Sequence, residues 1–435
     1  MILEPIRRAL KLDHLKSEDR NASFLIAEIF WSSILGCAAS FFAAFALRLG
    51  ASNTDIGLLS SIPPLLVILV ALPAGRFLQG VHNPRKWILG GLAVHRALYT
   101  FIFLVPFFAG LGLPLGTIAV WIFILIGLPG HLFNIGFVSL LADVVSEQRR
   151  AAVFSARGIV NNAASALLIF AFGVWLKEAP FPWSYQAMFG FGIVTSFISV
   201  RYLARIEVPA RAPHPPTPLS LSDELRKIKF ALVHNAAFRS LVRNTFLQSL
   251  MLWMSGPLFI LYYIKTCGAD EGWLGVNGTV SGLVTIASFV LWRRWMHRFG
   301  ESTILKVTMV LAGTFPLLVG ATTSLTLIVA ANALNAFANA GVGLSHFNTL
   351  LKVMPEKSRT EYTAYWSILM NAGAFAAPML GVLLAGWFGL APTLLFCGAV
   401  STVGALSFTL WPVRVPSSDT NKITSVANNP PKAGW

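Results

Sequence analysis

Long apolar runs separated by short polar connections dominate the chain. As a helix, a run of about twenty apolar residues is long enough to cross the ~30 Å hydrocarbon core of a bilayer. Hydropathy predicts about twelve such spans, at residues 22–47, 56–78, 87–110, 115–141, 151–176, 184–204, 240–264, 273–292, 304–320, 325–350, 362–387 and 393–410. The pattern therefore predicts an all-α protein that crosses the membrane many times.

Composition supports the same class. Hydrophobic residues make up 55% of the chain and charged residues 12%, and mean hydropathy is +0.68, which excludes a soluble core. The net charge of +15 would suggest nucleic acid in a soluble domain. Here the bases cluster in connections between apolar runs, where an anionic leaflet attracts them, so we expect a lipid partner and no nucleic acid.

The three cysteines lie far apart and mostly within apolar runs. Cys37, Cys267 and Cys397 therefore predict neither a disulfide framework nor a metal site. Nothing else in the sequence calls for a cofactor.

The distribution of Lys and Arg predicts the orientation. Of 33 such residues, only Arg48, Lys177 and Lys265 lie in or beside connections that follow odd-numbered spans. The positive-inside rule then places both termini and every even-numbered connection in the cytoplasm. The first 20 residues are basic and amphipathic, and we expect a surface helix there with no cleaved signal. The expected location is the bacterial inner membrane.

Composition changes abruptly between the sixth and seventh spans. A Pro-rich stretch is followed by a short basic amphipathic helix that we expect Ser222 to cap. This linker separates two halves of six spans each. The predicted units are an N-terminal bundle, the linker, a C-terminal bundle and a polar cytoplasmic tail, at residues 1–206, 207–238, 239–412 and 413–435.

An internal repeat relates the two halves. Residues 141–150, LADVVSEQRR, align without gaps on residues 350–359, LLKVMPEKSR, so that Arg150 matches Arg359. Residues 47–61 likewise resemble residues 263–278, and the matching pairs are Gly50 with Gly268, Ala51 with Ala269 and Gly57 with Gly275. Two halves repeated in parallel are typical of one class of secondary transporter.

The repeat also explains the charges of residues 141–154. They lie in the cytoplasmic turn between spans four and five, where a helix leaves the lipid. A catalytic role would need a desolvated pocket. We expect instead that Asp143, Arg150 and Arg359 belong to a solvated gate.

Two halves of six spans, cytoplasmic termini and a basic linker resemble the major facilitator superfamily. The segment AGRFLQGVHNPRKW at residues 74–87 is similar to that family's G-x-x-x-D-R-x-G-R-K loop. Gly75, Arg85 and Lys86 fit the motif, whereas Gln79 stands where the acid is expected. The segment HRFG at residues 297–300, which contains Arg298, is a second remnant.

The resemblance implies a pseudo-two-fold fold in which spans one, four, seven and ten line a central cavity. It also implies alternating access to a midplane site. The G-x-x-x-G-P-x-x-G-G pattern of drug/proton antiporters is missing from span five, and the membrane arginine of many proton-coupled members is missing from span four. Both absences argue against an efflux pump of the usual antiporter type.

Polar side chains within the spans are the candidates for function, because they are costly in hydrocarbon. Glu28 is the only carboxylate well inside a span, and it predicts either a proton site or a pair with nearby bases. Arg157 is expected to reach toward the membrane surface; an inward direction would imply an anionic substrate. His95 and Arg96 are expected to serve packing or the interface. The candidate substrate-binding residues are His131, Asn134, Gln248, Asn335 and Asn339.

The leading function is a monomeric secondary transporter for a small or amphiphilic solute, with proton coupling open. A transporter-like scaffold without a cavity is the alternative. Motifs of membrane enzymes and the phosphate-binding loop of ATPases are not found in the sequence, so we expect no enzyme activity. Substrate identity does not follow from the residues.

Overall fold

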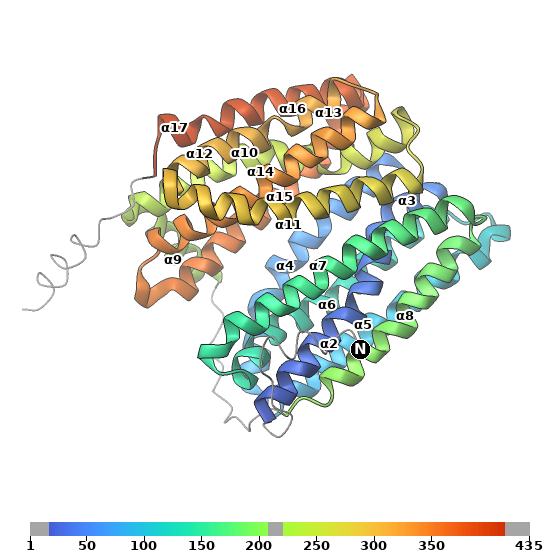
Figure 1. Ribbon diagram of the computed structural model, residues 1–435, viewed down its shortest axis with the longest axis horizontal. Coiled ribbons are helices and arrows are strands. Elements are labelled where there is room, and N and C mark those ends of the chain that lie inside the picture. The colour runs from blue at the N-terminus through green and yellow to red at the C-terminus, as the bar shows by residue number, and fades with distance from the viewer. Residues whose placement is uncertain (1–16, 208–220, 414–435) are drawn as a thin grey trace, which may run out of the picture.

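The computed structural model describes residues 17–207 and 221–413, which form helices joined by short connections. Three sequence-based expectations fall wholly or mainly outside these residues: the surface helix at the N-terminus, the Pro-rich part of the linker, and the polar tail. The helices are named as in Figure 1.

The first half of the chain forms one bundle, drawn blue to green in Figure 1. Ser52 and Asp55 form a capping box at the start of its second long helix, and Asn83 caps the third. The elements of this bundle are α2 (Ser17–Ser40), α3 (Phe42–Arg48), α4 (Asn53–Gly80), α5 (Pro84–Leu104), η1 (Val105–Leu111), α6 (Leu115–Val144), α7 (Glu147–Glu178) and α8 (Trp183–Leu203).

The second half forms a similar bundle, drawn yellow-green to red. Its elements are α10 (Ala236–Leu261), η2 (Tyr262–Thr266), α11 (Glu271–Phe299), α12 (Glu301–Gly313), α13 (Phe315–Gly320), α14 (Leu325–Val353), η3 (Glu356–Ser358), α15 (Arg359–Phe388), α16 (Leu390–Ala405) and α17 (Ser407–Leu410). The amphipathic linker helix α9 (Leu221–His234) includes Ser222 within its first turn and does not use it as a preceding cap. It buries Ile228 and Ala231 against the second bundle.

Eleven helical segments within the described residues are long and apolar enough to cross a membrane. α8, with 21 residues, packs along α2 and α5 and is the twelfth long segment. The predicted all-α fold of about twelve membrane helices in two bundles is confirmed. The bundles pack on each other mainly through two helix pairs, α7 with α11 and α4 with α15.

These two pairs are related by the internal repeat. Gly50 and Gly268 have φ values of 90° and 67°, in the left-handed region that favours glycine. Each lies two residues before the N-cap of the next helix, which is Ser52 for α4 and Asp270 for α11. Equivalent turns thus deliver α4 and α11 to equivalent places at the interface.

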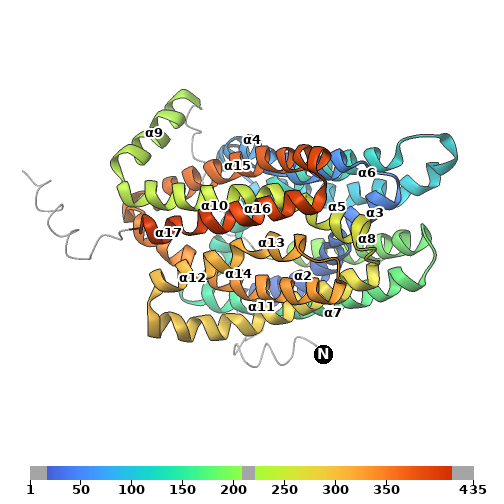
Figure 2. The same ribbon diagram turned by 90° about the horizontal axis from the view of Figure 1, so that it is seen from above.

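The bundles are close together at one end and separate toward the other (Figures 1 and 2). We name the close end, which carries η2, the η2 end, and the opposite end, which carries α9, the α9 end. Gly173 and Gly275 meet near the η2 end, where a Cβ on Gly275 would lie 2.8 Å from the Gly173 Cα. Gly158 and Gly282, farther along the same helices, have no neighbouring atom within 4 Å of such a Cβ.

Candidate substrate cavity and its buried charges

A buried ion pair crosses the inside of the first bundle. Arg157 on α7 donates from Nη2 to Glu28 Oε2 on α2 at 2.8 Å, and from Nη1 to the Leu25 carbonyl oxygen. Its guanidinium also lies 4.9 Å from the centre of the Phe137 ring. Arg157 therefore points inward and does not reach toward the membrane surface. The Glu28 carboxylate on α2 determines the direction of the Arg157 side chain. The periodicity of α7 alone does not reveal this contact, because the partner lies on another helix.

A second arginine is buried beside this pair. Arg96 on α5 donates from Nη2 to the Ser32 hydroxyl at 2.6 Å and lies within electrostatic reach of Glu28. Its Nε has no hydrogen-bond partner, and neither has Nδ1 of the adjacent His95. From the sequence, His95 and Arg96 are expected to serve packing or the interface. In the structure, Arg96 belongs to a buried charge cluster with Glu28 and Arg157.

The predicted cavity residues of the first bundle lie on α6. His131 is half-buried and within electrostatic reach of His95, whose ring lies against Gly130. Asn134 is exposed. His131 therefore lies near the charge cluster through His95, which precedes Arg96 on α5.

The second bundle contains a pocket of about 270 Å³ among α10, α12, α14 and α15. At one side His346 Nε2 is 2.8 Å from the Thr245 hydroxyl, and the His346 ring centre is 4.9 Å from that of Trp366. The other lining residues are Gln248, Ser249, Leu252, Trp253, Met309, Ala312, Asn339, Val342 and Met370. The walls carry aromatic faces, amides and hydroxyls, and no Asp, Glu, Lys or Arg.

The predicted residues of this half divide into two groups. Asn339 lines the pocket and donates to the Asn335 side-chain oxygen at 2.8 Å. Gln248 touches the pocket, but it is buried and its amide nitrogen donates to the Met309 carbonyl at 2.9 Å. Much of its hydrogen-bonding capacity therefore serves to join α10 to α12.

Sequence reasoning missed His346 and Thr245. A signal was present for His346, because it follows Asn339 by seven residues, or about two turns, and so continues the same face of the helix as Asn332, Asn335 and Asn339. Thr245 gave no such signal, since a hydroxyl within an apolar helix commonly bonds its own backbone.

The η2 end is held closed by contacts between the bundles. Glu271 on α11 is buried and accepts from Arg48 Nε at 2.6 Å and from the Tyr185 hydroxyl at 2.8 Å. Lys265 donates to the Asn53 side chain at 2.7 Å, and Lys177 lies 3.3 Å from Asp270. Arg48, Lys177 and Lys265 are the three basic residues that the sequence places at this end. Each has an ion-pair or amide partner across the interface.

The α9 end is open between the bundles. A pocket of about 830 Å³ lies there between α4, α9 and α15, lined by Arg76, Asp223, Glu224, Arg226, Lys227, Phe230, Ala231, Pro355, Ser358, Glu361, Tyr362 and Tyr365. Lys227 and Glu224 pair at 3.0 Å, and this carboxylate raises the pKa of Lys227 above its ordinary value. The lining is rich in charged residues, as expected for an entrance that opens to water.

Most of the predicted gate residues also lie at this end. Arg85 donates to the Ala204 carbonyl, Arg298 lies 5.3 Å from the centre of the Phe299 ring, and Arg359 is 3.7 Å from Glu356. All three contacts stay within one half. Arg150 Nε donates to the Val145 carbonyl at 3.0 Å.

The remaining gate candidates are Lys86, Gly75 and Asp143. Lys86 is exposed, and a Cβ on Gly75 would meet no atom within 4 Å, so α4 is not in close contact with another helix at that point. Asp143 lies on α6, but its side chain is outside the described part of the chain.

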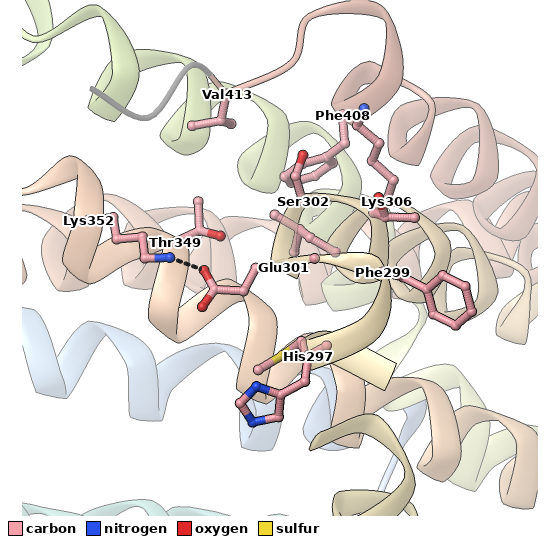
Figure 3. A pocket seen from close by; sticks show the side chains of 13 residues that line it. His297, Phe299, Glu301, Ser302, Lys306, Thr349, Lys352, Phe408 and Val413 are labelled. Atoms are coloured by element: carbon pink, nitrogen blue, oxygen red, sulfur yellow. Dashed lines mark hydrogen bonds and ion pairs between the residues drawn. The ribbon is translucent and has the colours of Figure 1, made fainter. Parts of the chain in front are cut away.

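The second remnant of the loop motif borders another pocket, of about 510 Å³, shown in Figure 3. Lys352 on α14 pairs with Glu301, the first residue of α12, at 2.6 Å, and Asn348 donates to the same carboxylate at 3.3 Å. In Figure 3 the His297 imidazole points away from this ion pair. The pair joins the α11–α12 turn to α14. Among residues 17–207 and 221–413, no three His, Cys, Asp or Glu side chains gather as metal ligands do.

Two membrane bundles closed at one end, open at the other and polar inside define a carrier-type membrane protein. The family model described as Major Facilitator Superfamily matches residues 24–245 and 241–435, and the chain belongs to that family. It is an integral multi-pass membrane protein and a secondary transporter, not an enzyme.

Solved structures share this fold. A POT family transporter in complex with 5-aminolevulinic acid is 14% identical, with 92% of this chain and 97% of that chain covered and a TM-score of 0.69. The nucleoside transporter NupG is 14% identical, with coverage of 89% and 99% and a TM-score of 0.65. A bacterial homolog of the human lysosomal transporter Spinster, in an inward-facing and unoccupied conformation, is 12% identical, with coverage of 91% and 95% and a TM-score of 0.61. No curated protein sequence matches the chain.

Proposed function

We propose that the protein carries a small amphiphilic solute across the membrane by alternating access, and that the solute binds in the second bundle, in the pocket of His346, Thr245 and Trp366. The observation that carries this proposal is the asymmetry of the interface. Contacts of Glu271 and of the paired glycines close the η2 end, while the α9 end is open. A carrier requires a polar interior that opens to one side of the membrane at a time, whereas a scaffold does not require one.

The pocket walls indicate the kind of solute. Trp253, Trp366 and the His346 ring offer flat apolar faces, and Asn339 and Thr245 offer hydrogen bonds. A volume of 270 Å³ divided by ~30 Å³ for one water molecule gives room for about nine non-hydrogen atoms. A compact solute with a flat apolar part and a polar edge fits best. His131 and Asn134 on α6 are the first bundle's candidates for contact with the solute.

Orientation and coupling complete the proposal. Nearly all bases lie at the α9 end, so this end is cytoplasmic and the structure is the inward-facing state. The bundles of residues 1–206 and 239–412 rock as units, joined by the linker of residues 207–238. The protein acts as a monomer in the bacterial inner membrane. Glu28 is the proton-coupling group, because it is the only carboxylate well inside a predicted span.

Cysteine accessibility tests the cavity. In a cysteine-free background, Asn339→Cys should react with a charged maleimide added at the α9 end and not with the same reagent at the η2 end. Val403→Cys, on the exposed surface of α16, is the control and should react from neither side. An Asn339→Cys variant that reacts from neither side would mean a filled centre and would favour the scaffold.

A ligand-stabilisation screen tests the solute. Sugars, organic anions, amphiphilic drugs and lipids are added to purified protein, since a ligand raises apparent stability by RT ln(1 + [L]/Kd). A hit should lose its effect in His346→Ala and keep it in the control His297→Ala, which is exposed outside the cavity. Equal loss in both variants, or in neither, would contradict the assigned pocket.

A further inference from the structure

The buried cluster of the first bundle carries one positive charge in excess. Glu28 contributes one negative charge, whereas Arg96 and Arg157 contribute two positive charges. Arg157 is neutralised by Glu28 through the 2.8 Å ion pair. The excess charge therefore belongs to Arg96, which is 7% exposed.

Among residues 17–207 and 221–413, Glu28 is the one carboxylate close to Arg96, and it is already paired with Arg157. Glu28, Arg96 and Arg157 lie 11, 12 and 10 residues from the α9 ends of their helices, which is about 15 to 18 Å at 1.5 Å per residue. Glu28 is the only carboxylate in the sequence at this depth; Asp55 and Glu271 lie at the η2 end, and Asp143 lies one residue from the end of α6. An uncompensated charge in hydrocarbon is unfavourable, so a partner for Arg96 is expected.

Arg96 is also incompletely bonded. The Ser32 hydroxyl accepts from Nη2, but Nε is buried without a partner. A guanidinium offers its N–H groups as a planar fork that matches a carboxylate. Ser32, the neighbour that Arg96 does bond, is only half-buried.

We propose that Arg96 is the binding site for a carboxylate group on the transported solute, and that binding of this carboxylate is coupled to protonation of Glu28. The inference rests on the proposed transport function and adds the charge of the solute. A bound carboxylate brings the cluster from a charge of +1 to zero and places a second negative charge near Glu28. That second charge makes proton uptake by Glu28 more favourable.

The coupling follows from linkage. Protonation of Glu28 removes the negative charge nearest to the site and strengthens the attraction of both arginines for an anion, and the anion in turn favours the proton by the same factor. The other titratable groups near the cluster are His95 on α5, His131 on α6 and Tyr99 on α5. On the adjacent helix α8, the segment at this depth carries Thr195, Ser196 and Ser199, which do not titrate near neutral pH.

The experiment compares two probes of the same shape, benzoate and benzamide. Melting temperatures of the purified protein are measured against the concentration of each probe between pH 5.5 and 7.5, at constant ionic strength with chloride as the balancing anion. Benzoate stays ionised over this range, because a carboxyl group titrates near pH 4. We expect benzoate to stabilise the protein and benzamide to have little effect. The apparent Kd of benzoate should fall by up to tenfold for each unit that the pH is lowered, as one bound proton per anion requires.

Variants assign the effect to residues. Arg96→Gln should abolish the preference for benzoate, while Arg293→Gln, exposed at the α9 end of α11, should keep it. Glu28→Gln should keep benzoate binding but lose its dependence on pH. If Arg96→Gln does not fold, Arg96→Lys keeps the charge but loses the planar fork, and it should weaken benzoate binding without changing the effect of benzamide.

The outcomes separate the two proposals. Equal stabilisation by benzoate and benzamide overturns the carboxylate site and leaves the aromatic pocket and transport intact. Binding of benzoate that does not vary with pH overturns the coupling to Glu28. Failure of the transport function itself would appear elsewhere, as an Asn339→Cys variant that cannot be labelled from the α9 end.

Discussion

At the scale of single residues, one buried carboxylate lies close to two arginines. Removal of the carboxylate should therefore destabilise the protein more than removal of one arginine. Glu28→Gln leaves two uncompensated guanidinium groups, whereas Arg157→Met leaves Glu28 beside Arg96, which can take over as its partner. Breaking a buried ion pair costs about 3–5 kcal/mol when one charge remains unpaired. We expect Glu28→Gln to lower the melting temperature of the detergent-purified protein clearly more than Arg157→Met.

The matched control for this comparison is Glu207→Gln. Glu207 pairs with Arg20 at the surface, and its side chain is 62% exposed, so its loss should change stability by less than about 1 kcal/mol. Equal losses for Glu28→Gln and Arg157→Met would show that Arg96 does not share Glu28.

At the scale of helices, the close approach of α7 and α11 makes a prediction about conformation. A Cβ on Gly275 would lie 2.8 Å from the Gly173 Cα and 3.0 Å from the Ile169 carbonyl oxygen, so Gly275→Leu should force the two helices apart at the η2 end. If the bundles rock as units, as proposed for alternating access, the α9 end should then close. Spin labels at Ala152 and Arg294 would report a shorter distance than in the unaltered protein.

Gly282→Leu is the control on the same helix, because a Cβ there meets no atom within 4 Å. The label distance should stay as it is in the unaltered protein. A similar shift in both variants would mean that added bulk on α11, and not contact with α7, moves the bundles.

At the scale of the whole molecule, the orientation can be tested directly. Lys229 on α9 and Thr54 on α4 are exposed at opposite ends of the bundles. In a cysteine-free background, Lys229→Cys should react with an impermeant reagent only after the cells are broken, because positive connections stay in the cytoplasm. Thr54→Cys should react in intact cells. Labelling of both from one side would exclude the twelve-span arrangement.

The sequence alone determined the membrane class, the two halves and the places where equivalent helices begin. These features depend on long apolar runs and on local turn chemistry, which a linear pattern records. Gly50 and Gly268, for example, are aligned by the repeat, and both have a positive φ. Seven residues later, Gly57 lies against α15 and Gly275 lies against α7, at the two contacts between the bundles. The resemblance to the family was visible for the same reason, although its loop motif has lost its acid at Gln79.

Only the tertiary structure decided which polar side chains meet. Arg157 turned inward to Glu28, Gln248 was used to join α10 to α12, and His346 entered the pocket without having been predicted. In a membrane helix both the lipid-facing and the packed faces are apolar, so periodicity does not tell which way a lone polar residue points. That direction is set by partners on other helices, and so the excess charge of Arg96 emerges only when α2, α5 and α7 are packed together.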